Sequence, residues 1–234
     1  MLASNEADRA FEWLSPFYIR PFESESPRLN TPLRKCLRLL AAQHALHFKQ
    51  DNVGNIYLSS PGRDPQLPPI GICFHLDDSK SPGTFEGALR AFFALKSSSL
   101  ICGVFLTGWS SLYEKGLGHD VWLGRSAAEE LYSSYPDLKQ FALMTDVAEF
   151  SMSATFEIVK SRSNPTHIRG SPVLVQKAQE AANAVSDVST SSSVITSDSR
   201  VPEIRIEGDH AIQLGTSVVQ AYSGYIQAIF DNFD

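Results

Sequence analysis

A histidine and two carboxylates follow one apolar run of the sequence. The run Ile70-Gly-Ile-Cys-Phe ends at His75, and Asp77 follows two residues later. A loop rich in glycine and proline then leads to Glu86, before an apolar pattern typical of a helix. A histidine beside a carboxylate suits proton transfer near neutral pH, and the same residue types bind metal ions. Three roles are open for this cluster: metal binding, other acid–base chemistry, or packing alone.

The apolar run that ends at His75 predicts a central strand of a parallel sheet, because it is apolar on both faces. Strands are predicted at 68–74, 100–106, 141–144, 155–160 and 202–206, with a strand–turn–strand unit at 48–58. Helices are predicted at 5–15, from 31 onward, and at 87–97, 121–132, 171–185 and 218–230. This alternation predicts a single α/β domain over residues 1–234, with three layers and a mostly parallel central sheet. Ligands of such sheets bind at the carboxyl ends of the strands, which is where His75 stands.

Two segments are predicted to be irregular. Residues 16–32 contain four prolines and two acids, so Pro16 should end the first helix and the segment should form a surface arm. Residues 186–199 are rich in serine and threonine, which predicts a mobile loop. The last helix should be capped at its start by Thr216 and Ser217.

The composition limits the class of protein. The chain has 234 residues, of which 43% are hydrophobic, enough for one sizeable core. The net charge of −6 and the lack of a dense basic block argue against a nucleic-acid partner. The three widely spaced cysteines predict buried free thiols in a reducing compartment. No apolar stretch has the length of a membrane span and no secretory signal is evident, so we expect a cytoplasmic protein without a membrane partner.

The segment 48–95 resembles the M20 metallopeptidase family, and most closely its N-carbamoyl-amino-acid amidohydrolase and allantoate amidohydrolase branch. The resemblance rests on Asp51-x-x-Gly54-Asn55, on His75-Leu-Asp77 and on Gly83-x-Phe-Glu86-Gly87. It returns near the C-terminus at His210, Thr216-Ser217 and Gly224. It implies the phosphorylase/hydrolase-like fold of the M20 catalytic domain.

The resemblance also implies roles for individual residues. Enzymes of this family hold two divalent metals with imidazole and carboxylate groups, and a separate glutamate is the general base. On this pattern His75 is the first ligand, Asp77 the carboxylate that orients it, Glu86 the bridging acid and His210 the last ligand.

Other positions of the family pattern are replaced. The glutamate pair that supplies the base and a ligand corresponds to Trp109 and Ser110, or in a shifted register to Thr107 and Gly108, and a further ligand corresponds to Met144. We therefore expect no bound metal and no other cofactor. The family's lid and dimerisation domain is also expected to be missing, because only residues 149–170 stand where it is inserted. The oligomeric state is left open.

The sequence favours a metal-independent enzyme that acts on a small, fairly apolar metabolite. His75, Asp77 and Glu86 would carry out acid–base catalysis or hold a reactive conformer, as in a cyclisation or isomerisation. The expected substrate-binding residues, each of which is alternatively ordinary packing or surface, are Trp109, Ser110, Tyr113, His119, Met144 and His210. Two alternatives are an inactive amidohydrolase that serves as a binding or regulatory partner, and a residual metal-dependent amidohydrolase.

Overall fold

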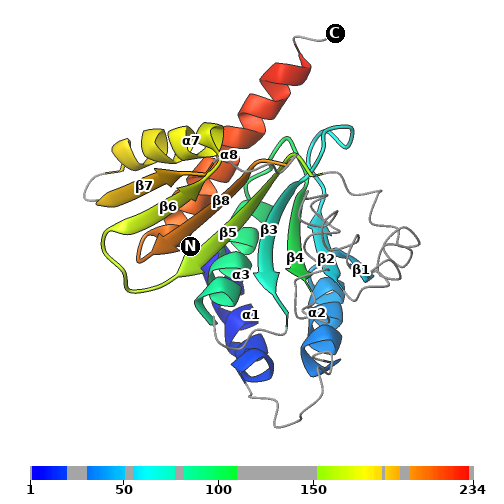
Figure 1. Cartoon of the computed structure of the whole chain (residues 1–234). Coiled ribbons are helices and arrows are strands. Elements are labelled where there is room, and N and C mark those ends of the chain that lie inside the picture. The colour runs from blue at the N-terminus through cyan, green and yellow to red at the C-terminus, as the bar shows by residue number, and fades with distance from the viewer. Residues whose placement is uncertain are drawn as a thin grey trace, which may run out of the picture.

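An eight-stranded sheet runs through the described part of the chain in the order β1-β2-β4-β3-β5-β8-β6-β7 (Figure 1). The computed structural model describes residues 2–19, 31–50, 55–76, 82–109, 152–185, 188–195 and 201–231. The central strands β4, β3, β5 and β8 are parallel to one another, and antiparallel pairs join β1 to β2, β2 to β4, and β6 to β8. The strands are β1 (His47–Gln50), β2 (Ile56–Ser60), β3 (Ile70–His75), β4 (Val104–Trp109), β5 (Ala154–Lys160), β6 (Thr166–Gly170), β7 (Thr190–Val194) and β8 (Glu203–Gly208). The predicted α/β class with a mostly parallel sheet is confirmed.

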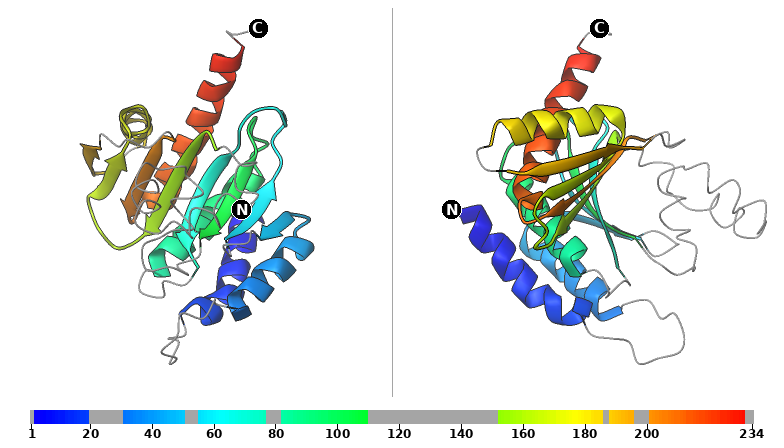
Figure 2. Two further views of the ribbon diagram at one scale, coloured as in Figure 1. Left: turned by 45° about the vertical axis from the view of Figure 1, so that its right-hand side comes forward. Right: turned by 60° about the vertical axis from the view of Figure 1, so that its left-hand side comes forward.

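The described helices pack on one face of this sheet (Figure 2). They are α1 (Leu2–Ile19), α2 (Thr31–Gln43), α3 (Pro82–Lys96), α7 (Pro172–Asn183) and α8 (Ala211–Phe230). Alternate strand residues such as Ile72, Phe156 and Ile206 point into the core beneath them. The residues between them point to the opposite face, which none of the described helices covers and which we call the open face. The predicted helix at 121–132 and the predicted strand at 141–144 lie outside the described residues. None of the described helices combines the length and hydropathy needed to cross a bilayer.

The first helix continues past Pro16, contrary to the prediction. It ends at Ile19, so residues 16–19 belong to α1 and not to an irregular arm. Pro16 has no N–H to bond the carbonyl of Glu12, but the Ser15 hydroxyl donates to that carbonyl at 3.4 Å. Tyr18 is only 2% exposed and stacks on Phe85 of α3, with ring centroids 4.5 Å apart. Core packing therefore outweighs the proline that the sequence prediction relied on.

The serine-rich segment forms a strand, so the loop predicted at 186–199 is wrong at residues 190–194. β7 pairs in parallel with β6 at the edge of the sheet, and His167 Nδ1 lies 2.6 Å from the Ser191 hydroxyl. Its side chains are mostly exposed, so it lacks the apolar alternation that sequence patterns rely on. Backbone pairing with β6 defines the strand.

Three other boundaries differ from the prediction. β4 begins at Val104, because the carbonyls of Leu100 and Ile101 accept loop N–H groups, and it continues through residues expected to be a loop. Helix α3 begins at Pro82, a favourable first position, so Glu86 lies within the helix. Helix α8 begins at Ala211, and the hydroxyls of Thr216 and Ser217 donate to the carbonyl of Gln213 inside it instead of capping its start.

The raised pKa of Tyr222 in α8 predicts that the protein loses stability at high pH. Burial, with smaller effects of Tyr225 and Cys102, raises the pKa of Tyr222 to about 12, and its hydroxyl donates to the Ser153 carbonyl at 2.9 Å. In the unfolded chain the tyrosine phenol has a pKa of about 10. The contribution of Tyr222 to the free energy of unfolding is therefore complete below that pH and is lost as the pH rises through about 12.

We expect Tyr222→Phe to cost about 1 kcal/mol at pH 8, through the lost hydrogen bond, and to reduce the decline in stability at higher pH. Urea unfolding at pH 8 and pH 11 measures both effects, with the more exposed Tyr225→Phe as the control. An alkaline decline in Tyr222→Phe as steep as in the wild type would contradict this assignment.

Candidate functional site

A cavity of about 260 Å³ lies on the open face, above the carboxyl half of β3 and the amino halves of the neighbouring strands β5 and β8. We call it the open-face pocket. Its wall contains both apolar and charged side chains, and its described lining residues are Cys73, His75, Thr155, Phe156, Glu157, Arg169, Ile195, Glu203, Ile204 and Arg205. The pocket is therefore built mainly from three adjacent parallel strands.

The alternation of the strands brings these polar side chains together. In β5, Phe156 and Ile158 are fully buried under the helices, so Glu157 between them points to the open face. In β8, Ile204 and Ile206 enclose Arg205 in the same way. Glu157 and Arg205 occupy paired register positions, which brings a carboxylate next to a guanidinium.

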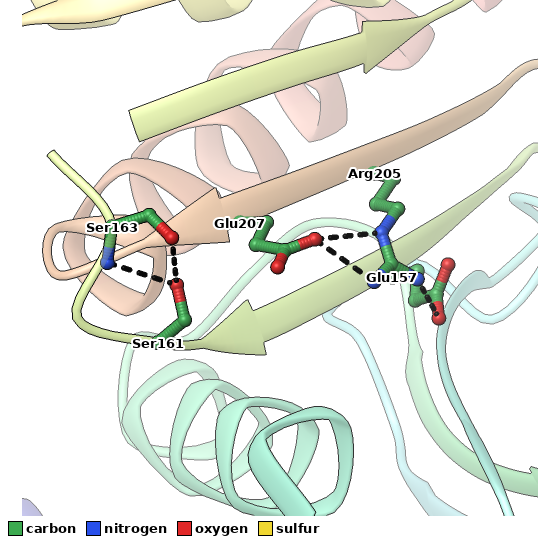
Figure 3. Close-up of polar contacts among 5 residues, drawn as sticks. All are labelled: Glu157, Ser161, Ser163, Arg205 and Glu207. Carbon is green, nitrogen blue, oxygen red and sulfur yellow. Dashed lines mark hydrogen bonds and ion pairs between the residues drawn. The ribbon is translucent and has the colours of Figure 1, made fainter. Parts of the chain in front are cut away.

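An ion-pair network fixes the wall of the pocket (Figure 3). Arg205 Nη1 donates to Glu157 Oε1 at 2.6 Å, while its Nη2 and Nε donate to Glu207 Oε2 at 2.9 and 3.2 Å. Burial acts to lower the pKa of Arg205, but the two carboxylates outweigh it and raise the pKa above its ordinary value. Arg205 therefore stays charged, and its orientation is fixed by acids on two strands.

His75 lies at the end of β3, where the apolar run predicted it, and it is one of the residues that line the pocket. Its backbone register partner on β4 is Trp109, so these two sequence candidates are adjacent in the sheet. Five further predicted site residues lie outside the described residues: Asp77, Ser110, Tyr113, His119 and Met144.

Glu86 is directed away from the pocket. Its Oε1 accepts a hydrogen bond from Arg90 Nε at 2.8 Å, and Arg90 also pairs with Asp8 of α1. These contacts connect α3 to α1 on the helical side of the sheet. Of the two described candidates for catalysis, His75 lines the pocket and Glu86 does not.

His210 lies at the start of α8, beside the carboxyl ends of the central strands β5 and β8. Its Nε2 is 3.6 Å from Asp209 Oδ2. Asp209 is held in turn by Lys160 Nζ, which donates to its backbone oxygen at 2.9 Å, and by the Thr166 hydroxyl, at 3.4 Å from Oδ1. His210 is not among the described residues that line the pocket.

The described residues do not fit a two-metal centre. Within the described ranges, no three side chains of His, Cys, Asp or Glu converge as a metal site would require. Glu86 is engaged by Arg90, and His210 lies beside Asp209. Thr107, the alternative candidate for the base position, is fully buried, and its hydroxyl has no hydrogen-bond partner within the described part of the chain.

The sequence prediction missed most of the charged pocket wall. Glu157, Arg169, Glu203 and Arg205 are all absent from the predicted site. A signal was present, because Glu203 and Arg205 alternate with Ile204 and Ile206 in a half-buried strand. That pattern indicates a polar open face, but it does not reveal which strand lies beside β8.

Comparison with known proteins identifies the fold. No protein-family model matches the chain, and no match was found among curated protein sequences. Among solved structures, AtUAH in complex with (S)-hydroxyglycine superposes with a TM-score of 0.63 at 12% identity, covering 95% of this chain and 97% of that chain. A hydantoinase/carbamoylase family amidase from Burkholderia multivorans gives 0.57 at 11% identity, covering 92% and 96%. Glutaminyl cyclase from Porphyromonas gingivalis gives 0.52 at 13% identity, covering 95% and 98%.

These likenesses show that the chain has the same α/β fold as these solved structures. This agrees with the α/β domain that the M20 resemblance implied. At these identities the agreement concerns the fold.

Proposed function

We propose that the protein is a metal-independent enzyme that transforms a small molecule in the open-face pocket, with His75 as the proton-transfer residue. The observation that carries this proposal is the position of His75, at the end of a central strand and in the wall of a cavity of about 260 Å³. Imidazole is the side chain best suited to exchange protons near neutral pH.

The fixed network in the wall of the same pocket supports a catalytic interpretation. Glu157, Arg205 and Glu207 hold one another by ion pairs of 2.6 and 2.9 Å, so these charges need little reorganisation when a substrate enters. The pocket is also lined by the apolar residues Cys73 and Ile195. We therefore expect a substrate with both an apolar and a polar part. Such a substrate is more polar than the fairly apolar metabolite expected from the sequence.

The proposed chemistry is a cyclisation or isomerisation, and not hydrolysis at a two-metal centre. Its support is that Trp109, Ser110 and Met144 occupy base and ligand positions of the family pattern, and that Glu86 pairs with Arg90. One protein of this fold is named a glutaminyl cyclase, so the scaffold is compatible with ring closure as well as with amidase activity. The sequence pattern at 48–95 supports descent from the N-carbamoyl-amino-acid and allantoate amidohydrolase branch.

A binding or regulatory role is the second candidate, favoured by the position of Glu86. Because this carboxylate pairs with Arg90, it is not directed at the pocket as an acid partner for His75. The three cysteines are buried thiols, and burial raises the pKa of Cys36 and Cys102, which supports a reducing compartment such as the cytoplasm.

A substrate screen with a His75→Gln variant tests the proposal. Purified protein is incubated with a library of small amides and cyclisable amino-acid derivatives, and the products are detected by mass spectrometry. For any compound that is turned over, we expect His75→Gln to lower kcat by about 100-fold or more while KM changes little, because the lost group transfers a proton.

The matched control is His47→Gln, which removes an exposed histidine from β1. It should retain full activity, and circular dichroism should show that both variants are folded. Unchanged turnover in His75→Gln, or activity that disappears after chelation and returns with zinc, would show that the proposal is wrong.

A further inference from the structure

We infer that Arg169 is an anchor for a carboxylate group of the ligand of the open-face pocket. This inference rests on the proposed function, because it names the substrate class of the same pocket. Arg169 is on β6, separated from β3 by β8 and β5, and it lines the cavity that also contacts His75.

Arg169 is a cation without an ion-pair partner among the described residues. Its side chain is exposed on the open face, and its register partner on β7 is the uncharged Ser193. The nearby acids Glu157 and Glu207 both bind Arg205. The guanidinium of Arg169 is therefore available to a molecule in the pocket.

The strand register makes this arrangement unfavourable without an anion. Arg169 lies directly opposite Arg205 in the antiparallel pair of β6 and β8. Like charges directly opposite each other on neighbouring strands destabilise a sheet. The two carboxylates that neutralise Arg205 are Glu157 on β5 and Glu207 on β8, and neither pairs with Arg169. An anion bound at Arg169 would therefore relieve the repulsion that remains between the two arginines.

The balance of charge favours a carboxylate over a phosphate. Glu157 and Glu203 line the same cavity, so the wall also contains two negative charges. A phosphate dianion would face both acids, whereas a carboxylate brings one charge and matches the planar fork of a single guanidinium. The apolar side chains of Cys73 and Ile195 provide the part of the wall that a hydrocarbon group would contact. The predicted ligand is a small monocarboxylate with an apolar body.

Fragment binding measures this preference without requiring turnover. The probes are benzoate, its uncharged analogue benzamide, and phenyl phosphate, each titrated against the full chain by ligand-observed NMR. We expect benzoate to bind more tightly than the other two probes. Arg169→Gln should weaken benzoate binding about tenfold, as expected for loss of a partly exposed charged hydrogen bond, and should leave benzamide binding unchanged.

The control is Arg63→Gln, which removes another exposed arginine, outside the pocket, and should change no affinity. Equal binding of benzoate and benzamide to the wild type, an unaltered benzoate affinity in Arg169→Gln, or tighter binding of phenyl phosphate would overturn the inference. His75→Gln should still bind benzoate. If benzoate binding depends on Arg169 but no compound in the library is turned over, the proposed catalytic function fails while the carboxylate anchor is supported.

Discussion

Replacing Gly87 by alanine is expected to destabilise the protein by about 3 kcal/mol or more, or to prevent folding. Helix α3 lies directly on β5 at this residue. A Cβ at position 87 would lie 2.0 Å from the carbonyl oxygen of Ile158, and one at Gly83 would lie 2.1 Å from that of Lys160. Both obstacles are backbone atoms of a central strand, which cannot move aside as a flexible side chain can. Urea unfolding followed by circular dichroism measures the change.

The matched control is Gly224→Ala in α8. A Cβ there would have no neighbour within 4 Å, so the substitution only removes the flexibility of a glycine inside a helix. We expect it to stabilise the protein by about 0.5–1 kcal/mol. If both variants were equally stable, the close approach of α3 to β5 would be refuted.

The Tyr18→Ala variant should lose about 3–5 kcal/mol of stability. The ring is nearly fully buried, stacks on Phe85 at 4.5 Å and lies edge-on to Phe74 at 6.4 Å. Removing it would leave a cavity where α1, α3 and β3 meet. The midpoint of urea unfolding reports the loss.

Glu12→Ala provides the comparison for Tyr18→Ala. Glu12 lies on the exposed side of the same helix, and its replacement should change stability by less than about 0.5 kcal/mol. A small effect of Tyr18→Ala, similar to that of Glu12→Ala, would mean that α1 does not continue past Pro16 into the core.

The sequence predicts the elements whose local pattern agrees with their final environment. β3 is recognisable because both of its faces are buried, and α7 because Ser171-Pro172 marks its start. The failures have tertiary causes. α1 passes Pro16 because Tyr18 packs in the core, and β7 forms because β6 supplies its hydrogen bonds. Neither cause is visible within a short window of sequence.

The candidate site is only partly predictable for the same reason. His75 follows from a local rule, because polar residues at the carboxyl ends of buried strands line clefts. The partnership of Glu157 with Arg205 depends on β8 inserting between β5 and β6, and Arg169 faces Arg205 only because β6 is antiparallel to β8. The orientation of Glu86 depends on Arg90, which pairs with α1.

The strand order also has a consequence for how the chain folds during synthesis. β3 pairs with β5, and α8 covers both α3 and β5, so contacts of the central core join segments that are far apart in the sequence. Proteins whose folds are dominated by such non-local contacts fold slowly. A ribosome adds only about 5–20 residues per second. The apolar residues of α3 and β3 should therefore stay accessible to chaperones for several seconds, until α8 has been made.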